Sequence, residues 1–371
     1  MRAGFNRNEL IVISAMSVTG LVWGADQLAM PLYLSRLGLT PFEVGALIGG
    51  MMIFGSLVGL LFSALADAYS RRPFATVGRL IAFLAFLALF LRIPIAALFV
   101  TGLGGASLGA LLAESATDLD RDFSMISSAS TGLSVVGASV PWLLGLRYTM
   151  LFNSLVMGST AASLLAASES YRGTRRVTLR LKSIGNVAKL STQAFIGLGA
   201  GLILPMMSLW FSLRFHVTVA QLSPVYMASN ALLSAATLTA PVLGKRLGRV
   251  KAITLTHAGG IALLLALPAC PAFLTAAGVF IARNVLMNMA GPLFNSLIMD
   301  IIPREERARA NSILGIIDSL PRASGPFVTG YIFSVGNLWL PFYVTASLYT
   351  AATAVFYLLF NNVNRASHAR S

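Results

Sequence analysis

Apolar stretches separated by short polar or charged segments recur from one end of the chain to the other. Each stretch holds about 20 residues, which as a helix matches the roughly 30 Å hydrocarbon core of a bilayer. The pattern therefore predicts twelve membrane-spanning helices. Their expected ranges are 8–34, 41–66, 73–91, 94–113, 123–145, 147–168, 187–213, 220–243, 252–269, 272–299, 310–333 and 338–360.

Several prolines lie inside these expected spans rather than at their ends. A proline within a helix removes a backbone donor and clashes with the preceding turn, so kinks are predicted at these positions. The internal prolines are Pro141, Pro205, Pro292, Pro321 and Pro326.

Composition supports a membrane protein and excludes several other classes. Of 371 residues, 56% are hydrophobic and only 11% are charged, and the mean hydropathy is +0.78. A soluble chain cannot bury so much apolar surface behind so little charge. The net charge of +14 comes without a basic recognition helix, so no nucleic-acid partner is expected. The single cysteine, Cys270, predicts neither a disulfide nor a metal cluster, and no cofactor is expected.

The distribution of basic residues predicts the topology. With the N-terminus inside, 20 of the 27 Lys and Arg residues fall in inner segments and only four fall in outer loops. Such an excess is typical of the cytoplasmic side, so a multi-pass protein of the cell membrane with both termini cytoplasmic is predicted. The four outer residues are Arg36, Arg92, Arg147 and Arg214.

Two basic hairpins predict an internal duplication. They lie at 63–72 and 241–251, and Leu65 and Arg71 match Leu243 and Arg249 at a constant offset of 178 (243 − 65). Glu114 and Arg121 likewise match Asp300 and Arg307 at an offset of 186 (300 − 114). Two six-helix halves related by a pseudo-two-fold axis produce such repeats. The expected halves are 1–168 and 187–371, joined by a basic cytoplasmic linker at 169–186.

The first hairpin carries a recognisable signature. Leu65, Ala66, Asp67, Arg71 and Arg72 resemble the motif that follows the second span in the major facilitator superfamily, although Ser63 and Ser70 replace its glycines. The segment 300–311 is similar to the loop between spans ten and eleven of that family. The resemblance covers nearly the whole chain. It implies twelve helices in two six-helix bundles and a carrier that works by alternating access.

The resemblance also implies roles for the hairpin residues. In the family the aspartate of this motif helps to hold the cavity closed towards the cytoplasm, so Asp67 and Arg71 are expected to act in gating, together with Arg72 and Arg249. The alternative is that the hairpins are ordinary charged turns that set the topology.

The first span contains an acidic residue, Asp26, deep within apolar sequence. Ionisable groups in spans are costly and mark functional sites. At 100° per residue, Asp26 shares a stripe with Thr19, Trp23, Met30 and Tyr33. Asp26 is therefore a candidate for proton uptake and release, and the aromatic and Met residues suit an amphipathic substrate. The alternative is an aspartate that is neutralised by a nearby base or that caps a kink.

The tenth span contains Arg283 with Asn284, Asn288 and Asn295, and the three asparagines share one face. An arginine with amide neighbours can bind an anionic or hydroxylated substrate. Equally, the asparagines can cross-link helices, and Arg283 can neutralise Asp26 from the opposite half.

Three further polar positions have simpler expected roles. Asp318 and Arg322 are four residues apart in span eleven and can form an ion pair, or act in coupling. Arg79 lies two turns into span three and is expected to extend to the inner surface. Ser107 stands in a Gly-x-Ser-x-Gly string, but this string lies within a span and small-residue packing explains it better than a catalytic elbow does.

The sequence thus predicts a secondary transporter of a small solute, without a nucleotide-binding motif and with protons as the coupling ion. Efflux of amphipathic, drug-like compounds is slightly favoured. Import or exchange of an anionic or polar metabolite is the alternative, and an intramembrane serine hydrolase using Ser107 is a remote one. The expected partners are the small-molecule substrate, protons and the lipid bilayer. A monomer is the default for this family, and enzymatic activity is not expected.

Overall fold

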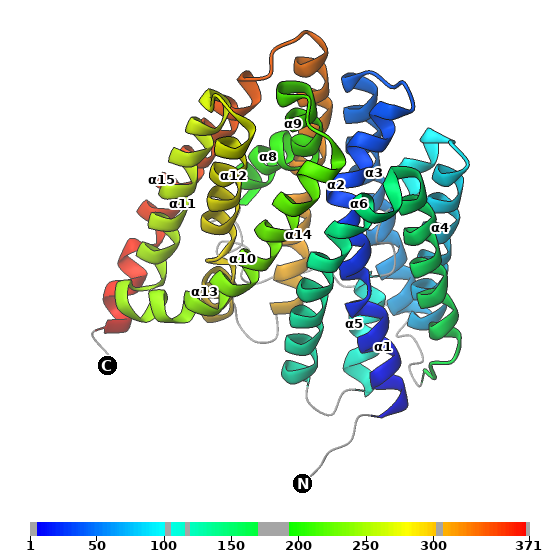
Figure 1. Ribbon diagram of the computed structural model, residues 1–371. Helices are drawn as coiled ribbons and strands as arrows, with labels where there is room; N and C mark the ends of the chain where they lie inside the picture. Colours follow the sequence, from blue (N-terminus) through cyan, green and yellow to red (C-terminus); the bar gives the residue numbers. More distant parts are fainter. Residues whose placement is uncertain (1–5, 101–104, 116–118, 170–192, 302–306, 369–371) are drawn as a thin grey trace. The chain divides into compact units, whose positions relative to one another are not determined.

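The computed structural model describes residues 6–100, 105–115, 119–169, 193–301 and 307–368, and these ranges contain helices and no strand (Figure 1). Within them, the side chains of some residues are not described. These side chains belong to Asp67, Ala106, Ala113, Ser115 and Gln193, and to residues 119–120, 298–301, 307–313 and 361–368.

The chain divides into two compact units. The first comprises Met1–Thr178 with Thr218–Met227, and the second comprises Leu179–Val217 with Ala228–Ser371. The first unit contains α1 (Arg7–Ser17), α2 (Thr19–Arg36), α3 (Pro41–Ala68), α4 (Arg71–Phe90), the 3-10 helix η1 (Pro94–Phe99), α5 (Gly105–Ser115) and α6 (Leu119–Leu165). The second contains α8 (Gln193–Ile203), η2 (Leu204–Met206), α9 (Met207–Phe215), α11 (Arg249–Ala266), η3 (Leu267–Ala269), α12 (Phe273–Asn288), α13 (Gly291–Ile301), α14 (Arg307–Ser334) and α15 (Leu340–His368). Helix α10 (Val219–Leu247) begins in the first unit and continues into the second.

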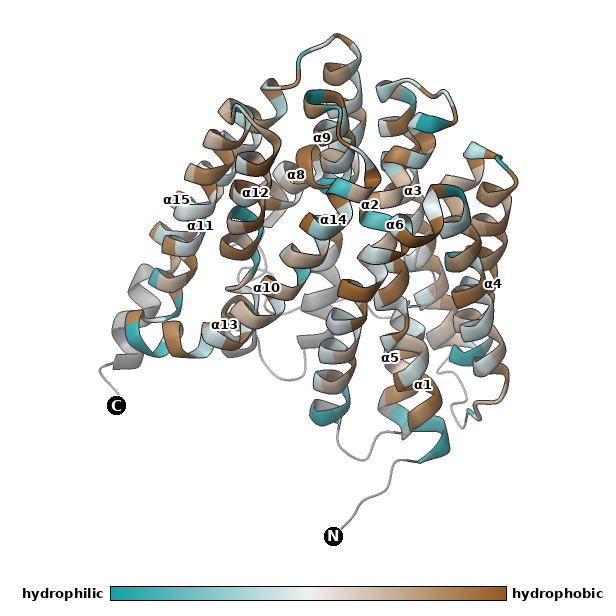
Figure 2. Ribbon diagram, viewed as in Figure 1, coloured by the Kyte–Doolittle hydropathy of each residue, from teal (hydrophilic) through white to brown (hydrophobic). Residues whose placement is uncertain are grey.

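Nine helical stretches in the described residues are long and apolar enough to cross a membrane. One of them, 121–165, contains two expected spans, because Gly145 at φ 76° interrupts the helix within α6. Leucines on several of these helices are exposed, and hydrophobic positions predominate along the helices of both units (Figure 2). The all-helical membrane fold predicted from the sequence is therefore confirmed.

The first helices begin where the sequence supplies caps. The side chain of Asn6 accepts from the backbone of α1, and Glu9 bonds back to the Asn6 N–H. Thr40 and Glu43 form the same reciprocal arrangement at the start of α3, where Pro41 is the first helical residue. These capping boxes satisfy backbone donors that would otherwise lack partners at the two helix ends.

The internal prolines have different effects. Pro205 lies in η2, between α8 and α9, and Pro292 follows the break between α12 and α13. Pro321 and Pro326, in contrast, lie inside α14, which remains one helix through both positions.

Glycines bring two helices of the first unit into backbone contact. A Cβ atom added to Gly20 or Gly24 of α2 would lie 2.0 Å from the carbonyl oxygen of Ser130 or Ser134 of α6, respectively. In the reverse direction, a Cβ on Gly137 would lie 2.1 Å from the carbonyl oxygen of Leu21. Small residues at such positions allow the close helix packing that is common in membranes.

The second unit repeats this arrangement between α8 and α14. A Cβ on Gly197 would lie 2.4 Å from the carbonyl oxygen of Asp318, and one on Gly201 would lie 2.0 Å from that of Arg322. Both α8 glycines follow their α2 counterparts by 177 (197 − 20 and 201 − 24). Both α14 residues follow their α6 counterparts by 188 (318 − 130 and 322 − 134). The two units thus contain the same helix–helix contact at constant offsets, as a duplication requires.

Candidate functional site

Asp26 lies in the middle of α2, two residues after the close contact at Gly24. Its side chain is half-buried, and its Oδ1 atom is buried without a hydrogen-bond partner among the described residues. A buried carboxylate oxygen without a partner is energetically costly, so Asp26 is the strongest candidate in the first unit for binding a proton or a ligand.

The other members of the predicted Asp26 stripe do not form one exposed surface. Trp23 is 57% exposed, whereas Met30 and Tyr33 are only 2% and 4% exposed. The Tyr33 hydroxyl donates to the carbonyl oxygen of Leu89 on α4, at 2.5 Å. Helical periodicity placed these residues on one face of α2. Neighbouring helices cover that face at Met30 and Tyr33 but leave Trp23 exposed.

Arg283 is the main charged residue in the interior of the second unit. It is 1% exposed, and its Nη2 donates to the hydroxyl of Tyr349 on α15 at 3.3 Å. The guanidinium carbon also lies 5.7 Å from the centre of the Tyr349 ring. The Nε and Nη1 atoms are buried without a hydrogen-bond partner in the described part of the chain. Arg283 therefore keeps unused donors in a desolvated position.

The asparagines next to Arg283 form a short polar chain. Asn284 Nδ2 donates to Ser229 Oγ on α10 at 2.8 Å, and Asn288 Nδ2 donates to Asn284 Oδ1 at 2.9 Å. Asn288 is exposed, whereas Asn295 lies on the separate helix α13 and is also exposed. The structure thus brings Asn284 and Asn288 together through hydrogen bonds, and it puts Asn295 on another element.

Asp318 and Arg322 form the ion pair that their spacing allowed. Arg322 Nε donates to Asp318 Oδ2 at 3.0 Å, and Arg322 Nη2 donates to Asp318 Oδ1 at 2.9 Å. Each side chain is 28% exposed. The backbone carbonyls of these residues are the two that the α8 glycines approach, so the bidentate pair lies on the close contact between α8 and α14.

The first hairpin is held by two acidic residues from other segments of its unit. Arg71 Nη1 forms an ion pair with Glu114 Oε1 of α5 at 2.6 Å, and the two side chains are 18% and 17% exposed. The carboxylate of Glu169 accepts from Ser70 Oγ and from the backbone N–H groups of Arg71 and Arg72. Glu169 therefore caps the N-terminus of α4.

The remaining predicted gating residues differ in how they are placed. The side chain of Asp67 lies outside the described residues. Arg72 donates to the carbonyl oxygens of Leu164 and Leu165 at the C-terminus of α6, which is a common role for arginine at a helix end. Arg249 is the first residue of α11, directly after Gly248 at φ 79°.

One acidic pair was not predicted from the sequence. Glu9 of α1 and Asp122 of α6 are both fully buried, and Arg121 contacts the two carboxylates at 3.0 Å each. Glu9 and Arg121 are separated by 112 positions in the chain, so no local spacing indicates the contact.

Arg79 and Ser107, whose roles were predicted from the sequence, both lie in the interior of the first unit. Arg79 is 7% exposed and its Nη1 contacts the sulfur of Met157 at 3.6 Å, so it does not extend to the surface as expected. Ser107 lies within α5 and is buried, and its hydroxyl has no hydrogen-bond partner among the described residues. Among the described residues Ser107 thus lies inside a helix, whereas a nucleophile elbow places its serine at a turn from strand to helix. No group of three or more potential metal ligands occurs in the described part of the chain.

Comparison with known proteins agrees with this architecture. The family model of the Major Facilitator Superfamily matches residues 190–371. No curated protein sequence matches the chain significantly.

Solved structures share the fold at low sequence identity. A mutant of the nucleoside transporter NupG superposes with a TM-score of 0.77 at 13% identity, covering 96% of this chain and 100% of that one. A bacterial homologue of the human lysosomal transporter Spinster, in an inward-facing and unoccupied conformation, gives 0.74 at 15% identity, with 94% and 95% covered. The D-xylose–proton symporter gives 0.72 at 13% identity, with 94% and 97% covered.

The helical fold with several membrane-length helices, the family match and the similar solved structures together support a polytopic secondary transporter. Residues 190–371 match the Major Facilitator Superfamily, and nearly the whole chain shares its fold with solved transporters of that kind, which indicates a transporter rather than an enzyme.

Proposed function

We propose that this protein moves a small polar, hydroxylated solute by alternating access and couples that movement to protons through Asp26. The observation that carries the proposal is the position of two charged residues, one in each unit. Asp26 and Arg283 both lie in membrane-length helices, and neither has an oppositely charged partner among the described residues. Because burying a charge in a membrane is costly, such residues are retained for a function.

Asp26 suits proton coupling because a carboxyl group can be either protonated and neutral or ionised and negatively charged. A carboxyl group in apolar surroundings holds a proton more readily than one in water, and hydration of the same group favours its release. A transporter that hydrates Asp26 in only one conformation links proton release to the conformational change.

The polar residues of the second unit support a hydroxylated solute. Arg283, with two unpartnered donors, and the hydrogen-bonded pair of Asn284 and the exposed Asn288 offer several donors and acceptors. Amide and guanidinium groups recognise hydroxyl groups by directed hydrogen bonds. Two proteins of similar fold are a nucleoside transporter and a D-xylose–proton symporter, and the substrates that their names give are both hydroxylated.

Efflux of an amphipathic cation is the second candidate, and one observation favours it. Trp23 is 57% exposed and precedes Asp26 by three residues on α2. An indole ring beside a carboxylate suits a cation that carries an apolar body. This candidate does not require Arg283.

Transport by purified protein in proteoliposomes tests the proposal. We expect uptake of a radiolabelled nucleoside or pentose that is driven by a proton gradient and competed by unlabelled solute. In Asp26→Asn, the gradient-driven accumulation should be lost while exchange at equal pH continues. Glu43→Gln is the matched control, since Glu43 is an exposed acid and glutamine also serves in a capping box. Gradient-driven accumulation that survives in Asp26→Asn would contradict the coupling role.

A further inference from the structure

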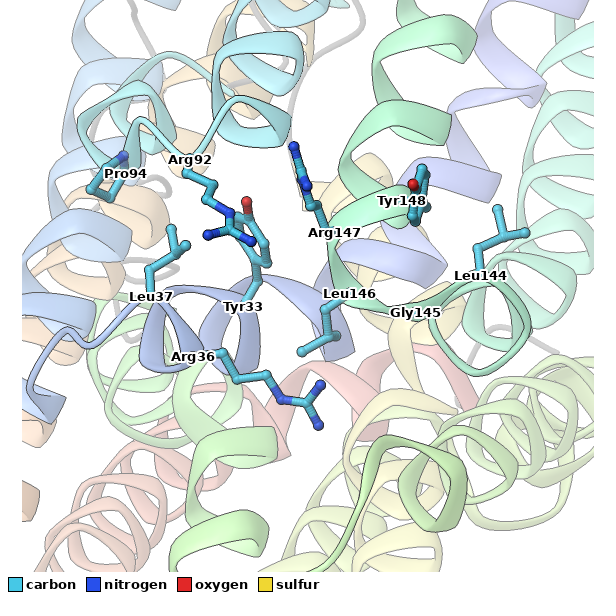
Figure 3. Close-up of a pocket in the computed structure, with 10 residues that line it drawn as sticks. All are labelled: Tyr33, Arg36, Leu37, Arg92, Pro94, Leu144, Gly145, Leu146, Arg147 and Tyr148. Carbon is cyan, nitrogen blue, oxygen red and sulfur yellow. The ribbon is translucent and has the colours of Figure 1, made fainter.

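Three of the four arginines in predicted outer loops line a single pocket of the first unit. This pocket has a volume of about 560 Å³ and lies where α2 ends, where α4 turns into η1, and where α6 resumes after Gly145. Its lining contains no acidic residue. The lining residues are Tyr33, Arg36, Leu37, Arg92, Pro94, Leu144, Gly145, Leu146, Arg147 and Tyr148 (Figure 3).

The arginine cluster lacks a counter-charge. In the described part of the chain, no carboxylate forms an ion pair with Arg36, Arg92 or Arg147. Like charges that share one pocket repel each other, and an anion bound between them offsets this repulsion because each arginine attracts it. Guanidinium groups bind phosphate in a bidentate manner, which gives the cluster its most suitable ligand.

Arg147 is held in position before any ligand arrives. Its guanidinium lies over the ring of Phe90, 4.6 Å from the centre, and its Nε donates to the Phe90 carbonyl oxygen at 3.1 Å. The two terminal nitrogens of Arg147 remain available, because neither has a partner among the described residues. Holding a side chain in advance lowers the entropic cost of binding.

Arg92 has an unusual backbone for a residue with a side chain. Its φ of 66° lies in the left-handed region, which only one other non-glycine residue in the described chain adopts. A left-handed residue commonly ends a helix, and here the Ile93 N–H donates to the Ala88 carbonyl oxygen, so the end of α4 fixes where the Arg92 side chain begins. Figure 3 shows the Tyr33 hydroxyl between the side chains of Arg92 and Arg147, while the Arg36 side chain extends away from them.

The location of the pocket also fits a phosphate group. By the predicted topology it opens at the outer membrane surface, where the phosphates of phospholipids lie. Its aromatic residues, Tyr33 and Tyr148, are typical of that interface. We propose that this pocket is an anion site that binds a phosphate group through Arg92 and Arg147, with Arg36 adding to the positive field. The inference does not depend on the proposed solute or on proton coupling.

Equilibrium dialysis with radiolabelled inorganic phosphate tests the site on the full chain in detergent, with chloride added to keep the ionic strength constant. We expect the wild type to bind phosphate. Each of Arg92→Gly and Arg147→Gln should weaken the affinity about tenfold or more. Arg92→Gly is informative because glycine accepts the φ of 66° without strain, so the melting temperature should not fall. Arg214→Gln is the matched control, since Arg214 is the fourth outer arginine and stacks on Phe215 outside this pocket.

The same measurement in nanodiscs distinguishes the source of the phosphate. If phosphatidylglycerol occupies the site, free phosphate should bind in detergent but not in phosphatidylglycerol nanodiscs. If a soluble phosphate is the ligand, binding should persist in both. Either result supports an anion site. Absence of phosphate binding by the wild type in detergent, or equal binding by Arg92→Gly and the wild type, would overturn it.

Discussion

Gly24 of α2 and Ser134 of α6 meet so closely that a Cβ atom on Gly24 would lie 2.0 Å from the Ser134 carbonyl oxygen. Gly201 of α8 and Arg322 of α14 have the same relationship, also at 2.0 Å. The side chains at the two partner positions differ completely, but the backbone contact is conserved between the two units. The feature that the two units share is therefore the close approach of the helices, whereas the polar side chains at the contact differ.

This close approach predicts that both glycines are essential for stability. Gly24→Ala and Gly201→Ala should each destabilise the protein by about 1–3 kcal/mol or more, because the added methyl meets a backbone carbonyl that cannot move aside. Gly59→Ala in α3 is the control, since nothing lies within 4 Å of a Cβ at that position. Thermal unfolding in detergent gives the comparison. A melting temperature for Gly24→Ala equal to that of Gly59→Ala would refute the contact.

The ion pair between Arg71 and Glu114 predicts energetic coupling between the first hairpin and α5. Both side chains are largely buried and 2.6 Å apart, so Arg71→Gln and Glu114→Gln should each lower stability. Their combination should cost less than the sum by about 1 kcal/mol or more, because the second substitution removes a charge that the first left unpaired. A double-mutant cycle, with the changes in melting temperature converted to free energies of unfolding, measures this coupling energy. Strict additivity would show that the pair does not interact in solution.

The Asp318–Arg322 pair on α14 makes a different prediction, for transport as well as stability. Asp318→Asn alone should be more harmful than Asp318→Asn combined with Arg322→Gln, because the single variant leaves an unpaired arginine on a membrane helix. Recovery of both folding and uptake in the double variant would identify the pair as structural. Recovery of folding without uptake would instead assign it to coupling.

The cap on α4 predicts a local effect. Glu169→Ala removes the acceptor for the N–H groups of Arg71 and Arg72 and should cost about 1 kcal/mol. Amide hydrogen exchange should increase in the first turn of α4, with little change in α3. Glu169→Gln keeps one carbonyl oxygen in this position and should be affected less. Unchanged exchange at Arg71 and Arg72 in Glu169→Ala would show that the cap contributes nothing.

The sequence predicted the fold class because it leaves a local signal, and the duplication stays a prediction that rests on similar local signals. Apolar length predicts spans, and the hairpins at 63–72 and 241–251 carry matching residues at one offset. The spacing of Asp318 and Arg322 likewise predicted their ion pair, since residues four apart share a helix face.

Contacts between distant helices could not be predicted in this way. Periodicity predicts that Met30 and Tyr33 share the Asp26 stripe, but it does not show that the Tyr33 hydroxyl donates to the Leu89 carbonyl oxygen of α4. Arg79 lies near a helix end, where extension to the surface is common, yet its guanidinium packs against Met157 of α6. The cluster of Arg92 and Arg147 depends on which span ends meet, and a count of outer arginines does not contain that information.

The most direct test of the account is whether solute movement carries protons. Wild-type protein in proteoliposomes loaded with a pH-sensitive dye should change the internal pH when a transported nucleoside or pentose is added outside. The change should depend on solute concentration and should be absent in Asp26→Asn. Solute transport without any change in internal pH, measured on the same vesicles, would contradict proton coupling through Asp26.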